Sequence, residues 1–265
     1  MLLSAIRCVS CFQLIAWFQV DSVPLQEFKS LGASLHVISY DDERTIVEAL
    51  QGVDILVSTV AWTVLVSAQV PLIKAAKAAG VKLFFPSDYG SLFDNEPNPS
   101  PIIRDLKTVL RVMKETGLPY TYVHNGGFPE YCFIPQLGYN FSQKKVTVWG
   151  DGNKKSTWTT VYSLADWIVN VLKTFPIDQL QNKHLRIEGF AVTTNKVIKL
   201  WEQKHNAKLE VEYRPMEDLD NRLKADEDDF AAALLQEWSS GRGEIGGRDN
   251  GMYPEWKPDT IESVL

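Results

Sequence analysis

Glycine is absent from the first 31 residues of this chain, and Gly32 is the first one. Folds that bind dinucleotides normally begin with a glycine-rich turn between their first strand and first helix. The small residues of that turn let the backbone approach a pyrophosphate. The turn is therefore not in its usual place, and a nucleotide site has to be argued from later parts of the sequence.

Positive charge is also scarce. The net charge is −6, and lysine and arginine form no stripe, which excludes a nucleic-acid-binding protein because phosphate contacts need clustered cations. With 265 residues, of which 45% are hydrophobic, the chain can bury a sizeable core. We expect a globular monomer or homodimer whose partner is a small molecule.

Cysteine and long apolar runs are few as well. Three cysteines give no even disulfide framework, which indicates a reducing, cytoplasmic compartment. Cys8 and Cys11 form a C-x-x-C pattern, but Cys132 and the four histidines add no metal-ligand spacing, so we expect no metal site. Polar residues interrupt the apolar N-terminus, and no later segment is suited to span a membrane. We therefore expect neither a signal peptide nor a membrane anchor.

Strand-like and helix-like segments alternate from residue 23 onward. The predicted strands lie at residues 35–39, 53–60, 81–85 and 119–123. The predicted helices lie at residues 43–50 and 103–116, with a further helix that ends at Gly80. Because parallel strands need helical crossovers, this order predicts an α/β fold with a parallel sheet covered by helices.

The pattern changes after Phe128. Residues 145–149 and 156–161 flank a Gly150-Asp151-Gly152 turn, which predicts an antiparallel hairpin. Shorter strands at 184–188 and 209–213 alternate with helices that start at Ser163 or cover 194–205 and 228–239. We divide the chain into an atypical N-terminal segment (1–22), a nucleotide-binding core (23–128) and a smaller α+β substrate lobe (129–265).

Two predicted strands end abruptly in small and polar residues. Phe85-Pro86-Ser87 ends one of them, and Asn125-Gly126-Gly127-Phe128 follows the other. The carboxyl ends of parallel strands deliver loops to a ligand crevice, so this layout is typical of a nucleotide-binding enzyme. Small residues let a flat ring approach the backbone, while the two phenylalanines supply apolar walls that exclude water.

Four ordered motifs carry a resemblance to a known family. They are Gly52-Val53-Asp54-Ile55-Leu56-Val57-Ser58-Thr59, Ala75-Ala76-Lys77-Ala78-Ala79-Gly80-Val81, Phe85-Pro86-Ser87-Asp88-Tyr89-Gly90 and Gly117-Leu118-Pro119-Tyr120-Thr121. The chain resembles the NmrA-like and isoflavone-reductase-like branch of atypical short-chain dehydrogenases, and most of all its fungal members. The resemblance covers about residues 30 to 260.

This resemblance implies a Rossmann-like, doubly wound parallel sheet that is incomplete at its N-terminus. It implies NADPH as cofactor and the reduction of small aromatic or phenylpropanoid-like carbonyl or ether substrates. Some members of the family instead sense the nucleotide and regulate partners without turnover, so a catalytically idle regulatory protein is the alternative.

The resemblance also assigns residues to the cofactor. In the family, the equivalents of Ser58 and Thr59 lie beside the cofactor ribose. The residues assigned to the nicotinamide are Phe85, Pro86 and Ser87 on one wall, and Asn125, Gly126, Gly127 and Phe128 on the other. Ordinary strand-end turns with core phenylalanines are the alternative interpretation.

The N-terminus departs from the family, which has a strand, a glycine loop, a helix and a second strand there. Residues Gln13 to Val20 are compatible with a strand, and Asp21 at its end is a candidate ribose ligand, although a plain strand or extension is the interpretation we favour. Losing two or three charge-assisted hydrogen bonds, each worth on the order of 1.5–3 kcal/mol, predicts an NADPH affinity at least several hundredfold lower. A truncated gene product with unrelated sequence at residues 1–22 would explain the same departure.

The catalytic lysine is the second departure. Relatives carry it on the helix before Gly117, and the family spacing falls on Leu106, with Lys107 one place later. One residue turns a helical side chain by about 100°. Lys107 is our candidate for orienting the ribose or moving a proton, with a solvated surface lysine as the alternative and Arg104 as a weaker substitute.

Two further patterns match family motifs only by letter. Residues 241–246 spell G-x-G-x-x-G, but they follow a predicted helix, so we interpret them as the loop that ends it. Residues 253–257 spell Y-x-x-x-K, which short-chain dehydrogenases carry on a helix. Pro254 and Pro258 argue against a helix there.

Overall fold

The computed structural model describes residues 13–16, 23–93 and 101–265. They form an α/β fold, as predicted, and divide into two compact units. Cys8, Cys11 and Asp21 lie outside the described residues. Among the helices of the described part, none has both the length and the apolar character of a membrane span.

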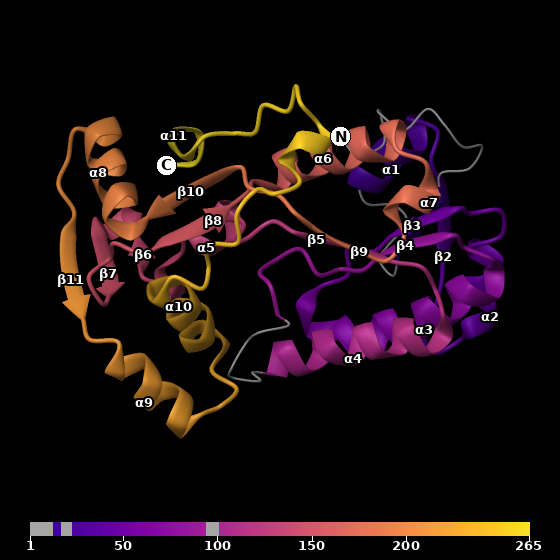
Figure 1. Cartoon of the computed structure of the whole chain (residues 1–265), viewed down its shortest axis with the longest axis horizontal. Coiled ribbons are helices and arrows are strands. Elements are labelled where there is room, and N and C mark those ends of the chain that lie inside the picture. Colours follow the sequence, from indigo (N-terminus) through magenta and orange to yellow (C-terminus); the bar gives the residue numbers. More distant parts are fainter. Residues whose placement is uncertain (1–12, 17–22, 94–100) are drawn as a thin grey trace. The chain divides into compact units, whose positions relative to one another are not determined.

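The first unit comprises the described residues up to Asp88 together with Asp105–Tyr122 and Ala165–His184. Its strands are parallel, as predicted: β1 (Gln13–Ala16) pairs with β2 (Ser34–Val37), and β3 (Ile55–Val57) pairs with β4 (Leu83–Phe85). β4 continues the sheet toward β5 (Thr121–His124), since the Phe84 N–H donates to the Pro119 carbonyl at 2.9 Å. The helices α1 (Val23–Ser30), α2 (Glu43–Ala49), α3 (Leu65–Ala79) and α7 (Ile177–Leu180) lie in this unit (Figure 1). So does most of α4 (Pro101–Thr116) and of α6 (Val161–Thr174), whose first four residues belong to the second unit, and β9 (Lys183–Arg186) begins here.

Local sequence explains where these helices begin and end. The Asp42 side chain accepts a hydrogen bond from the Arg44 amide and caps α2. Gly80 adopts the left-handed conformation, with φ of 80°, and ends α3. Buried apolar residues recur along α3 at helical spacing, so the helix turns one apolar face into the unit.

The second unit comprises Tyr89–Arg104, Val123–Leu164 and Leu185–Leu265. One sheet holds β6 (Tyr139–Asn140), β7 (Lys145–Trp149) and β11 (Glu210–Arg214), and a separate pair is formed by β8 (Lys155–Trp158) and β10 (Phe190–Thr193). Its helices are α5 (Pro129–Cys132), α8 (Thr194–His205), α9 (Glu217–Ala225), α10 (Phe230–Ser240) and α11 (Ile261–Val264). The boundary expected after residue 128 stays a prediction.

The predicted hairpin between residues 145 and 161 is wrong. Both strands exist, but β7 pairs with β11 in parallel and with β6, while β8 pairs with β10. The loop between them instead surrounds Asn195: the Asn195 side chain donates to the Asp151 carbonyl, and the Asn195 N–H donates to the Gly152 carbonyl. Gly150 donates to the Arg214 carbonyl at 2.8 Å, which directs β7 toward β11.

The start of α6 also differs from the prediction. Ser163 lies inside the first turn, and Thr160 precedes the helix and accepts the Ser163 N–H through its hydroxyl. The carboxylate of Asp259 accepts hydrogen bonds from both hydroxyls, at 2.5 Å from Thr160 and 3.3 Å from Ser163. The C-terminal segment is thereby tied to the first turn of α6.

Replacing Asp259 with alanine is expected to lower the free energy of unfolding by about 1–3 kcal/mol, because the buried Thr160 and Ser163 hydroxyls lose a charged acceptor. Urea denaturation measures the change. Thr260→Ala is the matched control, since the Thr260 side chain makes no capping hydrogen bond. Equal stabilities of the Asp259→Ala and Thr260→Ala variants would contradict the role of Asp259 as a stabilising hydrogen-bond acceptor.

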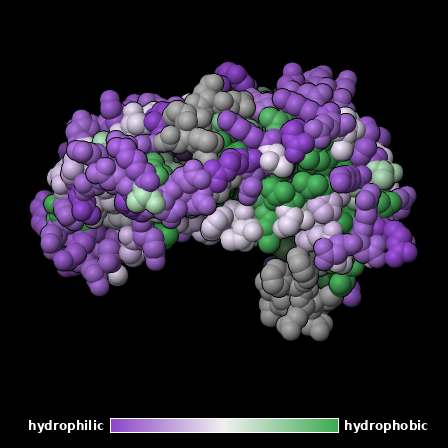
Figure 2. Space-filling view, turned by 90° about the horizontal axis from the view of Figure 1, so that it is seen from below, coloured by the Kyte–Doolittle hydropathy of each residue, from purple (hydrophilic) through white to green (hydrophobic). Residues whose placement is uncertain are grey.

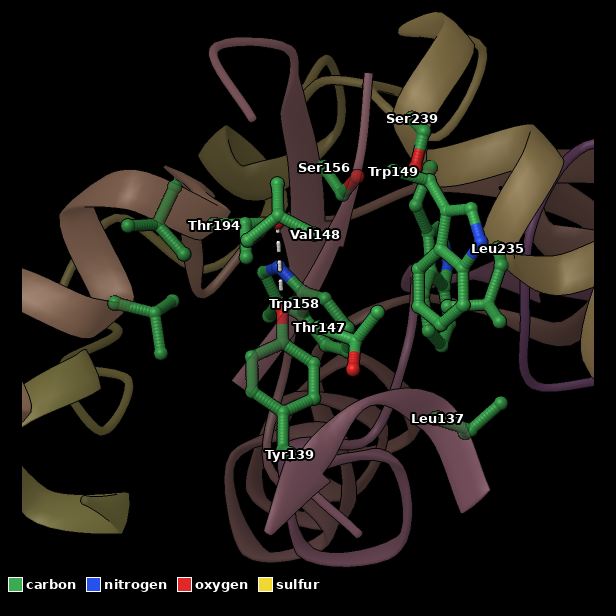
Figure 3. Close-up of a pocket in the computed structure, with 13 residues that line it drawn as sticks. Leu137, Tyr139, Thr147, Val148, Trp149, Ser156, Trp158, Thr194, Leu235 and Ser239 are labelled. Atoms are coloured by element: carbon green, nitrogen blue, oxygen red, sulfur yellow. Dashed lines mark hydrogen bonds between the residues drawn. The ribbon is translucent and has the colours of Figure 1, made fainter. Parts of the chain in front are cut away.

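Aromatic side chains make up much of the core of the second unit. Trp158 lies 4.9 Å from Trp238 and 5.0 Å from Phe133, measured between ring centroids. A cavity of about 20 Å³, the size of one water molecule, is lined in part by Trp149, Trp158 and Trp238 (Figure 3). Most of the face in Figure 2 is hydrophilic, with a hydrophobic patch.

Candidate functional site

The loops that follow β3 and β4 in the first unit hold each other in place. The Ser58 N–H donates to the Phe85 carbonyl at 2.8 Å. The Ser87 hydroxyl donates to the Val60 carbonyl at 2.8 Å, and the Ser87 N–H donates to Gln69 Oε1 at 2.7 Å. The residues predicted in this unit, Ser58, Thr59, Phe85, Pro86 and Ser87, therefore meet at the carboxyl ends of two paired parallel strands.

Two buried polar atoms of this region have no hydrogen-bond partner among the described residues. They are Ser58 Oγ and Gln69 Nε2. Ser58 is 3% exposed and Gln69 is 0% exposed. An unsatisfied buried polar group costs about 1–3 kcal/mol, so proteins rarely keep one without a use. The atoms suit a polar ligand at the strand ends.

Sequence reasoning missed Gln69. Its position on α3 lies within the buried apolar stripe formed by Leu65, Ala68, Leu72 and Ile73. A polar residue at a core position of an amphipathic helix was the available signal, because such a side chain needs a partner. The structure supplies that partner in the Ser87 backbone.

Phe85 is 1% exposed and Pro86 is buried, while Thr59 is exposed. The burial of Phe85 agrees with the core phenylalanine that was the alternative interpretation. Its assignment to the nicotinamide stays a prediction. Ser58 and Ser87 both belong to the hydrogen-bonded loops, and their cofactor-binding role also stays a prediction.

Asn125, Gly126, Gly127 and Phe128 follow β5 in the second unit. The N–H groups of Asn125 and Gly126 both donate to the Gly90 carbonyl, and the Asn125 carbonyl accepts from the Thr159 hydroxyl. Asn125 is fully buried, and its Oδ1 has no hydrogen-bond partner among the described residues. This amide oxygen is a candidate acceptor for a polar ligand in the second unit.

The two glycines are required by packing. Gly126 has a φ of +72°, and a Cβ there would overlap the Thr157 backbone. A Cβ on Gly127 would lie 2.5 Å from the Trp158 ring. Both residues therefore bring the chain close to β8, whatever further role they have toward a cofactor. Phe128 is half-buried, with its ring 6.0 Å from that of Tyr131.

Lys107 is exposed on α4. The helix runs without interruption from Pro101 to Thr116, and the preceding Leu106 is 7% exposed, so the two side chains lie on different faces. Arg104, the weaker substitute, forms an ion pair with Asp228 at 2.9 Å. A proton-transfer role for Lys107 stays a prediction.

The other candidate motifs have structural explanations. Gly241, with φ of 90°, ends α10 in the left-handed conformation, which confirms that the G-x-G-x-x-G run is a helix-ending loop. Tyr253 and Lys257 lie outside any helix, as predicted. Burial raises the pKa of the Cys132 thiol to about 12, so Cys132 is a poor nucleophile at neutral pH.

Comparison with known proteins identifies the family to which this chain belongs. Residues 17–244 match the model of the NmrA-like family. Phenylcoumaran benzylic ether reductase PT1 of Pinus taeda is 32% identical over 202 residues, which are 74% of this chain and 65% of that protein. Isoflavone reductase of Medicago sativa is 32% identical over 71% of this chain and 61% of its own length. The chain thus matches less than two thirds of the length of these two relatives.

Solved structures agree in fold. A crystal structure of an isoflavone reductase superimposes with a TM-score of 0.82 at 25% identity, covering 99% of this chain and 93% of that one. A structure with NADP+ and (+)-pinoresinol, 24% identical over all of this chain and 92% of the other, has a TM-score of 0.83 and shows the fold alone. The chain belongs to the NmrA-like family.

Proposed function

We propose that this protein is an NADPH-dependent reductase of small aromatic, phenylpropanoid-like substrates with a carbonyl or ether group. The observation that carries the proposal is the pair of hydrogen-bonded strand-end loops, with buried polar atoms that have no partner in the described part of the chain. The family's relatives include reductases of this kind. The net charge of −6 gives no support to an alternative polyanionic partner.

The residues of the strand ends fit part of this cofactor. Ser58 Oγ, in the first unit, can donate to or accept from a ribose hydroxyl. The Ser87 loop is fixed by two hydrogen bonds and would keep its shape when a flat ring approaches it. Bound NADPH would supply the hydride, and the chain's part is to bind, orient and exclude water.

Pyrophosphate binding rests on sequence alone. The family's glycine loop has no counterpart before Gly32, and residues 1–12 and 17–22 lie outside the described residues. We expect an NADPH affinity at least several hundredfold below that of a protein with the loop, because its backbone N–H groups and helix dipole stabilise the pyrophosphate.

The second candidate function is a catalytically idle protein that binds the nucleotide and regulates a partner. The exposed position of Lys107 favours it, since a general acid needs to reach the reacting group. Such a protein would keep the strand-end loops without a residue that moves protons.

Titration of NADPH fluorescence with the full chain, followed by NADPH oxidation with aromatic carbonyl and ether substrates, separates the two functions. Under the reductase proposal with Lys107 as proton donor, Lys107→Ala lowers kcat by about 10²-fold or more. Lys114→Ala, another exposed lysine of α4, is the control and leaves kcat unchanged.

Each outcome has one meaning. Binding with no substrate-dependent oxidation supports the idle protein, and absence of binding contradicts both functions. Oxidation that survives Lys107→Ala unchanged keeps the reductase and removes Lys107 from its mechanism.

A further inference from the structure

Gln69 has a buried side-chain amide whose oxygen makes a hydrogen bond and whose nitrogen makes none among the described residues. The residue is 0% exposed, and Oε1 accepts the Ser87 N–H at 2.7 Å. Nε2 has no partner among the described residues. A core position on α3 would be filled more favourably by leucine or methionine unless both halves of the amide had a task.

The orientation of this amide follows from the Ser87 contact. If the oxygen and nitrogen were exchanged, two donors would face each other, so the oxygen must point to the Ser87 N–H. The NH2 group is then fixed in the other direction. It can only donate, so its partner must be an acceptor.

The charge of the neighbouring loop narrows the choice of acceptor. Asp88 follows Ser87 directly and is 6% exposed, and no lysine or arginine occurs in residues 55–61 or 83–90. A phosphate oxygen bound there would find no lysine or arginine on either of these two segments to balance its charge. A neutral oxygen, from a ribose hydroxyl or a carboxamide, fits this environment.

We propose that Gln69 is a positioning residue of the cofactor site, whose Oε1 fixes the Ser87 backbone and whose Nε2 donates to a neutral oxygen of the bound nucleotide. This inference rests on the proposed function. One side-chain amide then links the cofactor to the loop after β4, so that the loop is held most firmly when the cofactor is bound.

The test measures NADP+ binding by calorimetry with wild type, Gln69→Leu and Gln69→Glu. Gln69→Leu removes both hydrogen bonds and is expected to weaken binding by about tenfold or more. A protonated glutamic acid can accept from Ser87 and still donate, whereas a carboxylate can only accept. Full burial raises the pKa of a glutamic acid to about 8–9, so the loss in Gln69→Glu should be small near pH 6 and grow toward pH 9, relative to wild type at each pH.

The two possible oxygens are told apart with thionicotinamide-NADP+, in which sulfur replaces the carboxamide oxygen. If the carboxamide is the partner, this analogue binds wild type less tightly than NADP+ does, and Gln69→Leu abolishes the difference. If a ribose hydroxyl is the partner, the ratio of the two affinities is the same in both proteins.

Ser67→Ala, an exposed change on the same helix, is the control and should bind as wild type does. A Gln69→Glu loss that does not change with pH, or a Gln69→Leu variant with wild-type affinity, would overturn the role of Gln69 while leaving the reductase proposal intact. If wild type binds no NADP+, the proposed function fails and the inference falls with it.

Discussion

Gly126→Ala is expected to lower the free energy of unfolding by at least about 3 kcal/mol. The residue has a φ of +72°, which strains any L side chain, and the new Cβ would overlap the carbonyl of Thr157. Relief would require β8 to move, yet the Gly127 N–H and the Thr159 N–H join the same two segments on either side, through the Thr157 and Gly127 carbonyls. Urea denaturation followed by circular dichroism measures the loss.

Gly90→Ala is the matched control. A Cβ on Gly90 meets nothing within 4 Å, and its φ is not in the left-handed region. The Gly90 carbonyl still accepts from Asn125 and Gly126 in this variant. We expect its stability to stay within about 0.5 kcal/mol of wild type. A Gly126→Ala protein as stable as Gly90→Ala would show that the close approach to β8 is not rigid.

Trp158→Ala is expected to destabilise the protein by about 3–5 kcal/mol. The side chain is 2% exposed and packs between Trp238 and Phe133 beside the small cavity of Figure 3. Removing the indole enlarges that cavity in a region that cannot collapse easily, since the surrounding rings are rigid. Thermal and urea unfolding measure the effect, and Trp158→Phe should lose less.

A double-mutant cycle with Gly127 tests the same contact. A Cβ on Gly127 would lie 2.5 Å from the Trp158 ring, and Gly127 has no left-handed φ. Gly127→Ala should therefore be costly in wild type and much less costly in the Trp158→Ala background. Additive losses would contradict the assignment of the cost to this ring.

The periodicity of the sequence predicted most elements because their signals are local. Asp42 and Gly80 mark helix ends through their own backbone and side-chain chemistry. The residues with which β7 pairs in β11 and β8 pairs in β10 lie 32 to 65 positions away, which no turn motif reveals. The hairpin prediction failed for that reason.

The residues of the candidate site also divide into those with a local sequence signal and those that depend on long-range contacts. The positions of Ser58 and Ser87 at strand ends were predicted because strand ends are readable from the sequence, whereas the contact of Gln69 with Ser87, 18 residues away, needed the three-dimensional structure. Lys107 was located by counting, and the uninterrupted α4 places it on the exposed face. Most of the glycine-free N-terminal segment, residues 1–12 and 17–22, lies outside the described residues, so the prediction for it stays a prediction.

The division of the chain into interleaved segments has a consequence for its biosynthesis. The first unit is completed by Ala165–His184, and the second by Leu185–Leu265. The ribosome must therefore release His184 before the first unit has all its parts, and nearly the whole chain before the second does. Until then, partly assembled strands stay exposed to aggregation and to chaperones.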